Sequence, residues 1–129
     1  MAAPPSNRKA MVVDQDAASL SLTAEALHSF APGFDVATAN DAGQAIAWLE
    51  TFHPDILLMS QSFAVSDEGI LAARVRGDER TRHCKIIVVS DADPGEDKVG
   101  LRSDGADATL VKPLNLPLLL QTVRKVLDH

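Results

Sequence analysis

A set of polar side chains stands directly after the apolar runs of this sequence, where reactive groups are found in α/β proteins. They are an acid, two serines and a base: Asp14, Ser60, Ser90 and Lys112. A carboxylate can hold a divalent cation, a serine hydroxyl can attack once a base activates it, and a lysine can bind an anion. Each of these chemistries requires that the side chains meet at one place in the fold.

Alternating strands and helices must position these residues. Apolar runs predict strands over Lys9–Val13, Ile56–Met59, Ile86–Val89 and Ala108–Val111, and an alternating pattern predicts an edge strand over Phe34–Ala39. Apolar residues at helical spacing predict the helices between them. These cover 17–30, the stretch from Ala42 to the stop at His53–Pro54, 68–76, a short segment around Val99–Leu101 that Gly105 ends, and the stretch from the cap Asn115 to Leu127.

This order of elements predicts an α/β fold of the (βα)5 type, a parallel sheet with helices on both faces. Right-handed crossovers and the edge character of the second strand predict the strand order 2-1-3-4-5. The polar residues that follow the first, third, fourth and fifth strands then converge at one edge of the sheet. Residues 1–8 are expected to be a disordered lead-in, and residues 9–129 to form one domain.

Net charge and composition limit the classes of partner and the cellular compartment that we expect. The formal net charge is −6, which disfavours nucleic acid and an anionic membrane surface as partners. No apolar run approaches the length of a membrane span. The single cysteine, Cys84, excludes an internal disulfide, so a cytoplasmic protein is expected.

Four segments in register carry a resemblance to a known family. VVDQD ends the first strand in acids, PDILLMS contains the third strand, IIVVSD ends the fourth, and GADATLVKP leads to a lysine–proline pair. This set resembles the receiver domain of two-component response regulators, and the similarity extends from about Lys9 to Leu127. The resemblance implies a flavodoxin-like (βα)5 fold, a signalling role rather than an enzyme, and a cis peptide at Lys112–Pro113.

The sequence departs from the family at the positions that carry the family's chemistry. Ser60 stands where the resemblance places the phosphoacceptor aspartate, and Gln15 stands where it places a direct Mg²⁺ ligand. The family positions for a small residue after the fourth strand, an aromatic switch residue and a proline after the acceptor hold Asp91, Thr109 and Ala64.

Phosphoryl transfer onto a receiver needs an ionised carboxylate and a Mg²⁺ ion. Ser60 supplies a neutral hydroxyl that needs a base to activate it, and the nearest carboxylates, Asp14 and Asp91, have no known general-base role here. Since neither Ser60 nor Gln15 supplies a negative charge, we expect no metal and no cofactor at this edge. Ser60 is interpreted as a small polar residue that closes a strand. An alternative phosphosite is the competing interpretation.

The residues that match the family also have structural interpretations. Lys112 is expected to pair with Asp14, with Asp91 as a second candidate. Ser90 can contact a ligand, but a role in capping the following turn is favoured. Asp14 and Asp16 are expected to form a residual acidic rim rather than a metal site.

Two surfaces stand apart from this edge. At the start of the last helix, Leu114, Leu116 and Leu118 are added to inward positions already filled by Leu119, Leu120 and Val123. They predict a partner face, such as a homodimer through the last helix, or else Leu116 packs back onto the loop after Lys112. The second surface is a solvated basic loop expected at the opposite edge of the sheet, with Arg74, Arg76, Arg80 and Arg82.

Taken with the resemblance, these residues favour a degenerate receiver: a phosphorylation-independent module that binds protein partners in a phosphorelay. A phosphorylation-switched receiver with a non-standard acceptor is the alternative. A small flavodoxin-like enzyme is disfavoured because no phosphate-cradling loop follows the first strand.

Overall fold

The computed structural model describes residues 8–30, 34–60, 68–90, 107–111 and 115–127. Its strands are β1 (Arg8–Val13), β2 (Phe34–Ala39), β3 (Ile56–Ser60), β4 (Lys85–Ser90) and β5 (Ala108–Val111). Its helices are α1 (Ala17–Phe30), α2 (Ala42–Thr51), α3 (Glu68–Gly77) and α5 (Leu116–Leu127).

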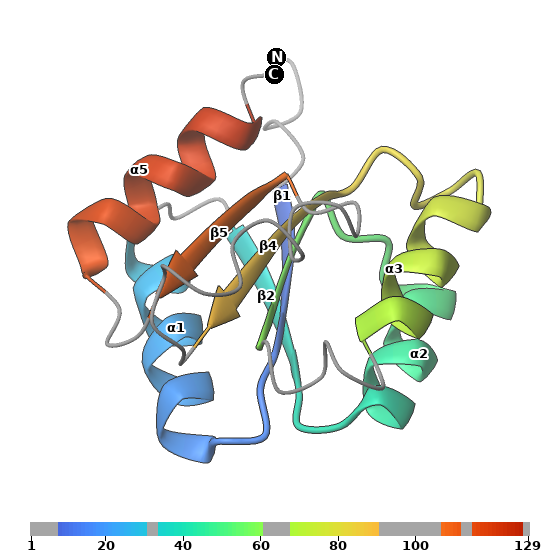
Figure 1. The fold of residues 1–129 in the computed structure, drawn as a ribbon, viewed down its shortest axis with the longest axis horizontal. Helices are drawn as coiled ribbons and strands as arrows, with labels where there is room; N and C mark the ends of the chain where they lie inside the picture. The colour runs from blue at the N-terminus through green and yellow to red at the C-terminus, as the bar shows by residue number, and fades with distance from the viewer. Residues whose placement is uncertain (1–7, 31–33, 61–67, 91–106, 112–114, 128–129) are drawn as a thin grey trace, which may run out of the picture.

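The strands form one parallel sheet in the order β2-β1-β3-β4-β5, which confirms the predicted topology. Helices α1 and α5 cover one face of the sheet, and α2 and α3 cover the other (Figure 1). The carboxyl ends of the strands therefore share one edge, and the amino ends share the opposite edge.

Successive residues of each strand enter different cores, because side chains of a strand alternate between its two faces. In β3, Leu57 and Met59 pack in the core beneath α2 and α3, whereas Ile56 and Leu58 pack in the core beneath α1 and α5. Every residue of β3 is buried. The continuous apolar run in the sequence is thus a strand covered on both faces.

Two strands extend further toward the carboxyl edge than the apolar runs predict. β3 includes Ser60, whose Cα partner on β4 is Val89, and β4 includes Ser90, whose Cα partner on β5 is Val111. A strand ends where its backbone pairing ends, and a polar side chain such as that of serine does not prevent this pairing. The helix predicted around Val99–Leu101 lies outside the described residues.

The helix starts follow local capping chemistry. Asp41 precedes α2, and its carboxylate accepts the Gln44 N–H at 2.8 Å, while the Gln44 side chain accepts the Asn40 N–H at 3.0 Å. Asn115 accepts the Leu118 N–H at 3.0 Å and so caps α5, as predicted. These contacts satisfy N–H groups that a helix leaves unpaired at its first turn.

Candidate functional site

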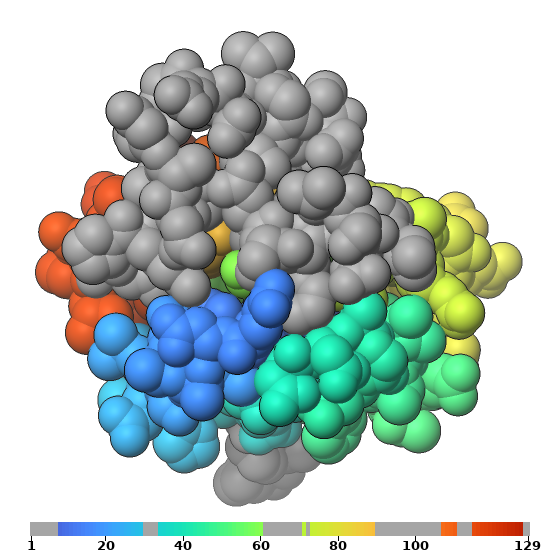
Figure 2. Space-filling view, turned by 60° about the horizontal axis from the view of Figure 1, so that its bottom comes forward, coloured from blue at the N-terminus to red at the C-terminus, as the bar shows by residue number. Residues whose placement is uncertain are grey.

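The carboxyl edge of the sheet brings Asp14 and Ser60 to neighbouring positions. Val13 on β1 is the Cα partner of Met59 on β3, so Asp14 and Ser60 are the next residues along adjacent strands. Both are buried, with 5% and 2% of their surface exposed. Figure 2 shows this edge, where the segment after β1 (blue) and the start of α2 (teal) lie side by side on the surface.

Asp14 is positioned by the backbone around it. Its N–H donates to the Ala39 carbonyl at 3.1 Å, which continues the pairing of β1 with β2. Its carboxylate accepts the Asp16 N–H at 2.9 Å. A buried carboxylate requires such donors, so the turn after β1 fixes Asp14 as a hydrogen-bond acceptor at the edge.

Asp16 has a structural role that the sequence interpretation did not assign. One oxygen of its carboxylate accepts the Ala18 N–H at 3.1 Å, and the other accepts the Ser19 hydroxyl at 3.1 Å. A carboxylate at this position satisfies the first turn of α1 and interacts favourably with the helix dipole. Gln15, between the two acids, is exposed.

Ser60 contributes one hydroxyl at the buried end of β3. With Asp14 beside it in register, this edge of the sheet offers a hydroxyl that can donate or accept a hydrogen bond and a carboxylate that can accept one. Within residues 8–30, 34–60, 68–90, 107–111 and 115–127, no group of three or more His, Cys, Asp or Glu could hold a metal ion.

The other predicted site residues are placed only in part. Thr109 is half-buried in β5, where Val88 is its Cα partner, and Ser90 ends β4. Asp91, Lys112 and Pro113 lie outside the described residues. The ion pair predicted between Lys112 and Asp14, and the cis peptide at Lys112–Pro113, therefore stay predictions.

The start of α5 presents apolar side chains outward as well as inward. Leu116 and Leu118 are 36% and 48% exposed, whereas Leu119 and Val123 are buried. Beside them lies a hollow of about 300 Å³ that Pro117, Leu120, Gln121 and Arg124 line. Leu114 falls outside the described residues, as does the loop after Lys112.

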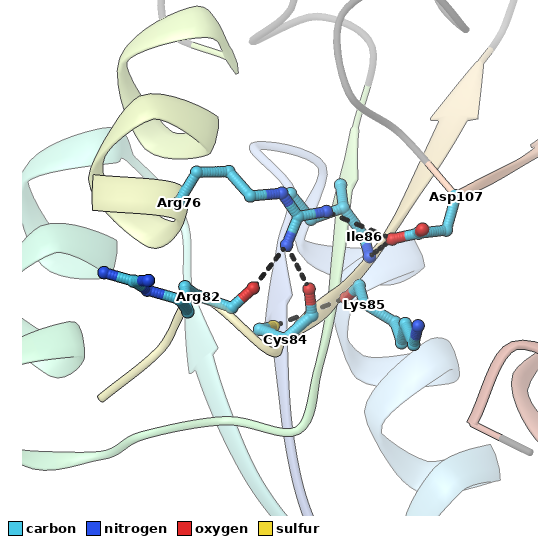
Figure 3. A network of polar contacts seen from close by, with 6 residues as sticks. All are labelled: Arg76, Arg82, Cys84, Lys85, Ile86 and Asp107. Carbon is cyan, nitrogen blue, oxygen red and sulfur yellow. Dashed lines mark hydrogen bonds and ion pairs between the residues drawn. The ribbon is translucent and has the colours of Figure 1, made fainter. Parts of the chain in front are cut away.

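The amino edge contains a network of polar contacts where the sequence predicts a solvated basic loop (Figure 3). Arg76, at the end of α3, donates to the carbonyls of Arg82 and Cys84 and pairs with Asp107 at 3.2 Å. The Asp107 carboxylate also accepts the Ile86 N–H at 2.8 Å. Arg76 thereby joins α3 to the starts of β4 and β5, which corrects its interpretation as part of a freely solvated loop.

Two further residues, Trp48 and Cys84, have environments that the sequence does not predict. The Trp48 indole is 41% exposed, donates to the Thr38 carbonyl at 3.2 Å, and meets the Phe52 ring edge-on at 5.6 Å. Cys84 is buried, and burial raises the pKa of its thiol to about 12. A thiol held neutral in this way is a poor nucleophile.

Comparison with known proteins agrees with this architecture. The family model for the response regulator receiver domain matches residues 10–124. The chain is 29% identical over 119 residues to the DNA-binding dual master transcriptional regulator RpaA of Synechocystis sp., covering 91% of this chain and 48% of RpaA. It is 22% identical over 120 residues to the polar-differentiation response regulator DivK of Brucella ovis, covering 93% of this chain and 96% of DivK.

A solved structure shows the same fold. The chain superposes on a response regulator from Thermotoga maritima with a TM-score of 0.81 at 24% identity, covering 95% of this chain and 99% of that one. The chain thus spans about half of RpaA but nearly all of DivK. Among the helices of the described residues, none is long and apolar enough to cross a membrane.

Proposed function

The chain belongs to the response regulator receiver domain family, and from this membership we propose that it is a degenerate receiver whose binding to protein partners does not depend on phosphorylation. Receiver domains act as signalling modules that interact with partners. In this proposal, the chain has lost the phosphoryl chemistry of the family and has kept the binding of protein partners. We also propose that the protein is cytoplasmic and acts in a phosphorelay.

Ser60 is the observation that carries the proposal. It ends the central strand at the position that matches the family's phosphoacceptor aspartate, and it is buried beside Asp14. Attack on a phosphoryl donor needs an ionised carboxylate or a hydroxyl activated by a base. Ser60 supplies a neutral hydroxyl in place of that carboxylate, and we propose that the acceptor position therefore takes up no phosphoryl group.

Gln15 and Asp16 support the same proposal. Gln15 occupies the position that matches a family Mg²⁺ ligand and carries no charge. The Asp16 carboxylate contacts the first turn of α1 with both oxygens. Among the described residues of this edge, Asp14 is then the main carboxylate left for a Mg²⁺ ion, and we expect such binding to be weak, since Mg²⁺ sites use one or two carboxylates.

The outward leucines of α5 are the proposed partner surface. Leu116 and Leu118 are both exposed in the first turn of the helix, and large apolar side chains exposed on a surface are typical of association sites. The occupant we propose is a protein, with a second copy of this chain as the simplest case. The net charge of −6 favours a protein over nucleic acid.

Sedimentation of the purified chain, with and without Mg²⁺ and acetyl phosphate, tests this function. We expect a concentration-dependent dimer whose dissociation constant is the same under both conditions. A dissociation constant that changes only with acetyl phosphate would show a phosphorylation-switched receiver instead. A chain that stays monomeric at all concentrations would remove the homodimer from the proposal.

A further inference from the structure

The amino edge of the sheet contains a hollow that lies at the opposite end of the strands from Ser60. Its volume is about 260 Å³. The residues that line it come from the start of β1, the turn before β3, the start of β4 and the end of α5: Arg8, Asp55, His83, Lys85 and Leu127. Since the sheet brings these separate segments together, the hollow is a product of the fold rather than of one loop.

Asp55 is fixed at the centre of this edge. Its carboxylate accepts the Lys9 N–H at 2.8 Å, its own N–H donates to the Lys9 carbonyl at 2.7 Å, and its carbonyl accepts the Lys85 N–H at 3.0 Å. The second carboxylate oxygen lies 3.5 Å from the His83 ring nitrogen Nε2. Asp55 therefore holds β1 and β4 in place and directs its charge toward His83.

Two cations, Arg8 and Lys85, line the hollow, whereas two other bases of this edge are already paired. Arg76 is paired with Asp107, and Arg80 is paired with Asp78. Arg8 and Lys85 form no ion pair with any residue that the structure describes. The hollow thus holds two basic side chains against the single carboxylate of Asp55.

We propose that this hollow binds a small phosphate-type anion. An arginine and a lysine from two strands can donate to several oxygens of one anion, and charge-assisted hydrogen bonds of this kind are the strong ones. The volume lies below the range of about 300–1,000 Å³ that is usual for larger ligands. It suits inorganic phosphate or a compact phosphomonoester, whose organic part would lie against Leu127.

The dipole of α5 disfavours an anion at this edge, and two basic residues of the helix offset that effect. α5 ends at this edge, and the carbonyls of its last turn carry partial negative charge. Arg124 and Lys125 lie in that last turn. Their charges favour the helix end and reduce its repulsion of an anion.

A titration with inorganic phosphate, followed by amide and imidazole NMR shifts at low ionic strength, tests the site. Sodium chloride at matched ionic strength controls for screening. We expect saturable shifts centred on Arg8, Asp55, His83 and Lys85. Arg8→Gln and Lys85→Gln should each weaken binding by about tenfold, the loss expected for one charge-assisted hydrogen bond.

Arg74→Gln is the matched control, because it removes the same charge from a residue of α3 that lines a different hollow. It should leave the affinity within about twofold of wild type, since it keeps the proposed donors. Thermal unfolding of each variant checks that the fold is retained. Glycerol phosphate in a second titration distinguishes a phosphomonoester site, which should bind it more tightly than phosphate, from a site for the free ion.

The proposal fails if phosphate gives no saturable shifts, or if it binds the Arg8→Gln and Lys85→Gln variants as tightly as wild type. It also fails if Arg74→Gln weakens binding as much as they do, because the anion would then sense only the overall charge. None of these outcomes bears on the proposed loss of phosphoryl transfer at Ser60, which lies at the other edge of the sheet.

Discussion

The two edges of the sheet use their polar residues in different ways. At the carboxyl edge, the carboxylates of Asp14 and Asp16 accept hydrogen bonds from the turn after β1 and the start of α1. At the amino edge, Asp55 and Asp107 bridge segments far apart in the sequence. These contacts of the acids at the carboxyl edge are thus local, whereas the acids at the amino edge join strands to distant segments among the residues that the structure describes.

The comparison predicts that the amino edge is more sensitive to substitution. Asp107→Ala removes the acceptor of the buried Ile86 N–H and the partner of Arg76, and should lower the free energy of unfolding by about 2 kcal/mol. Urea denaturation measures this change. Ser60→Ala at the carboxyl edge is the contrast, and we expect it to cost less than half as much.

Asp107→Asn separates the two contacts of that carboxylate. Asparagine can still accept the Ile86 N–H, but it cannot pair with Arg76. Both side chains of the pair are about one-third exposed, so the ion pair should contribute little. A loss as large for Asn as for Ala would show that the ion pair, rather than the backbone hydrogen bond, holds this edge.

On the carboxyl side, the outward leucines should affect association and not folding. Leu118→Glu should weaken self-association or partner binding by about tenfold, because a leucine buried at an interface contributes roughly 1.5 kcal/mol or more. Leu22→Glu is the control, since Leu22 is equally exposed but lies on α1. Sedimentation and thermal unfolding are the measurements, and an unchanged dissociation constant in the folded Leu118→Glu variant would place the interface elsewhere.

The smallest expected effect is an acid-dependent loss of stability at the amino edge. A hydrogen bond from the Arg80 side chain lowers the pKa of Asp78 from its ordinary 3.8 to about 2. A lowered carboxyl pKa adds stability above the unfolded pKa, and that stability is lost as the pH falls from about 4 toward 2. Arg80→Gln should unfold at lower urea than wild type at pH 5, with the difference vanishing near pH 2; a constant difference would contradict the assignment.

Much of this fold could be predicted from the sequence, because buried parallel strands produce continuous apolar runs. The run at β3 predicts its strand, and the cap Asn115 predicts the start of α5. Ser60 was expected after its strand because a hydroxyl interrupts an apolar run, although its backbone still pairs with β4. Local patterns therefore predict elements better than they predict where those elements end.

The contacts of the amino edge could not be predicted in the same way. Arg76 and Asp107 are separated by 31 positions, and only the packing of α3 beside β4 and β5 brings them together. Arg8, Asp55 and Lys85 come from three segments with no shared motif. At the other edge, the resemblance to a family supplied the positions of Ser60 and Gln15, which residue types alone would not have singled out.

Restoring the lost groups tests the central claim most directly, with intact mass after treatment with acetyl phosphate and Mg²⁺ as the measurement. If only the chemistry was lost, the variant that combines Gln15→Asp and Ser60→Asp regains a metal ligand and a nucleophile. Its new carboxylate at position 60 can attack the phosphorus of acetyl phosphate and release acetate. Ser60→Asp alone should gain little, because the metal site still lacks one carboxylate.

We expect the double variant, or the same variant with Asp91→Ala to remove a competing carboxylate, to gain the mass of one phosphoryl group that hydroxylamine removes. Wild-type protein should gain none under the same conditions. A wild-type chain that gains this label would contradict the degenerate receiver outright. A folded triple variant that gains none would contradict the claim that Gln15, Ser60 and Asp91 account for the lost activity.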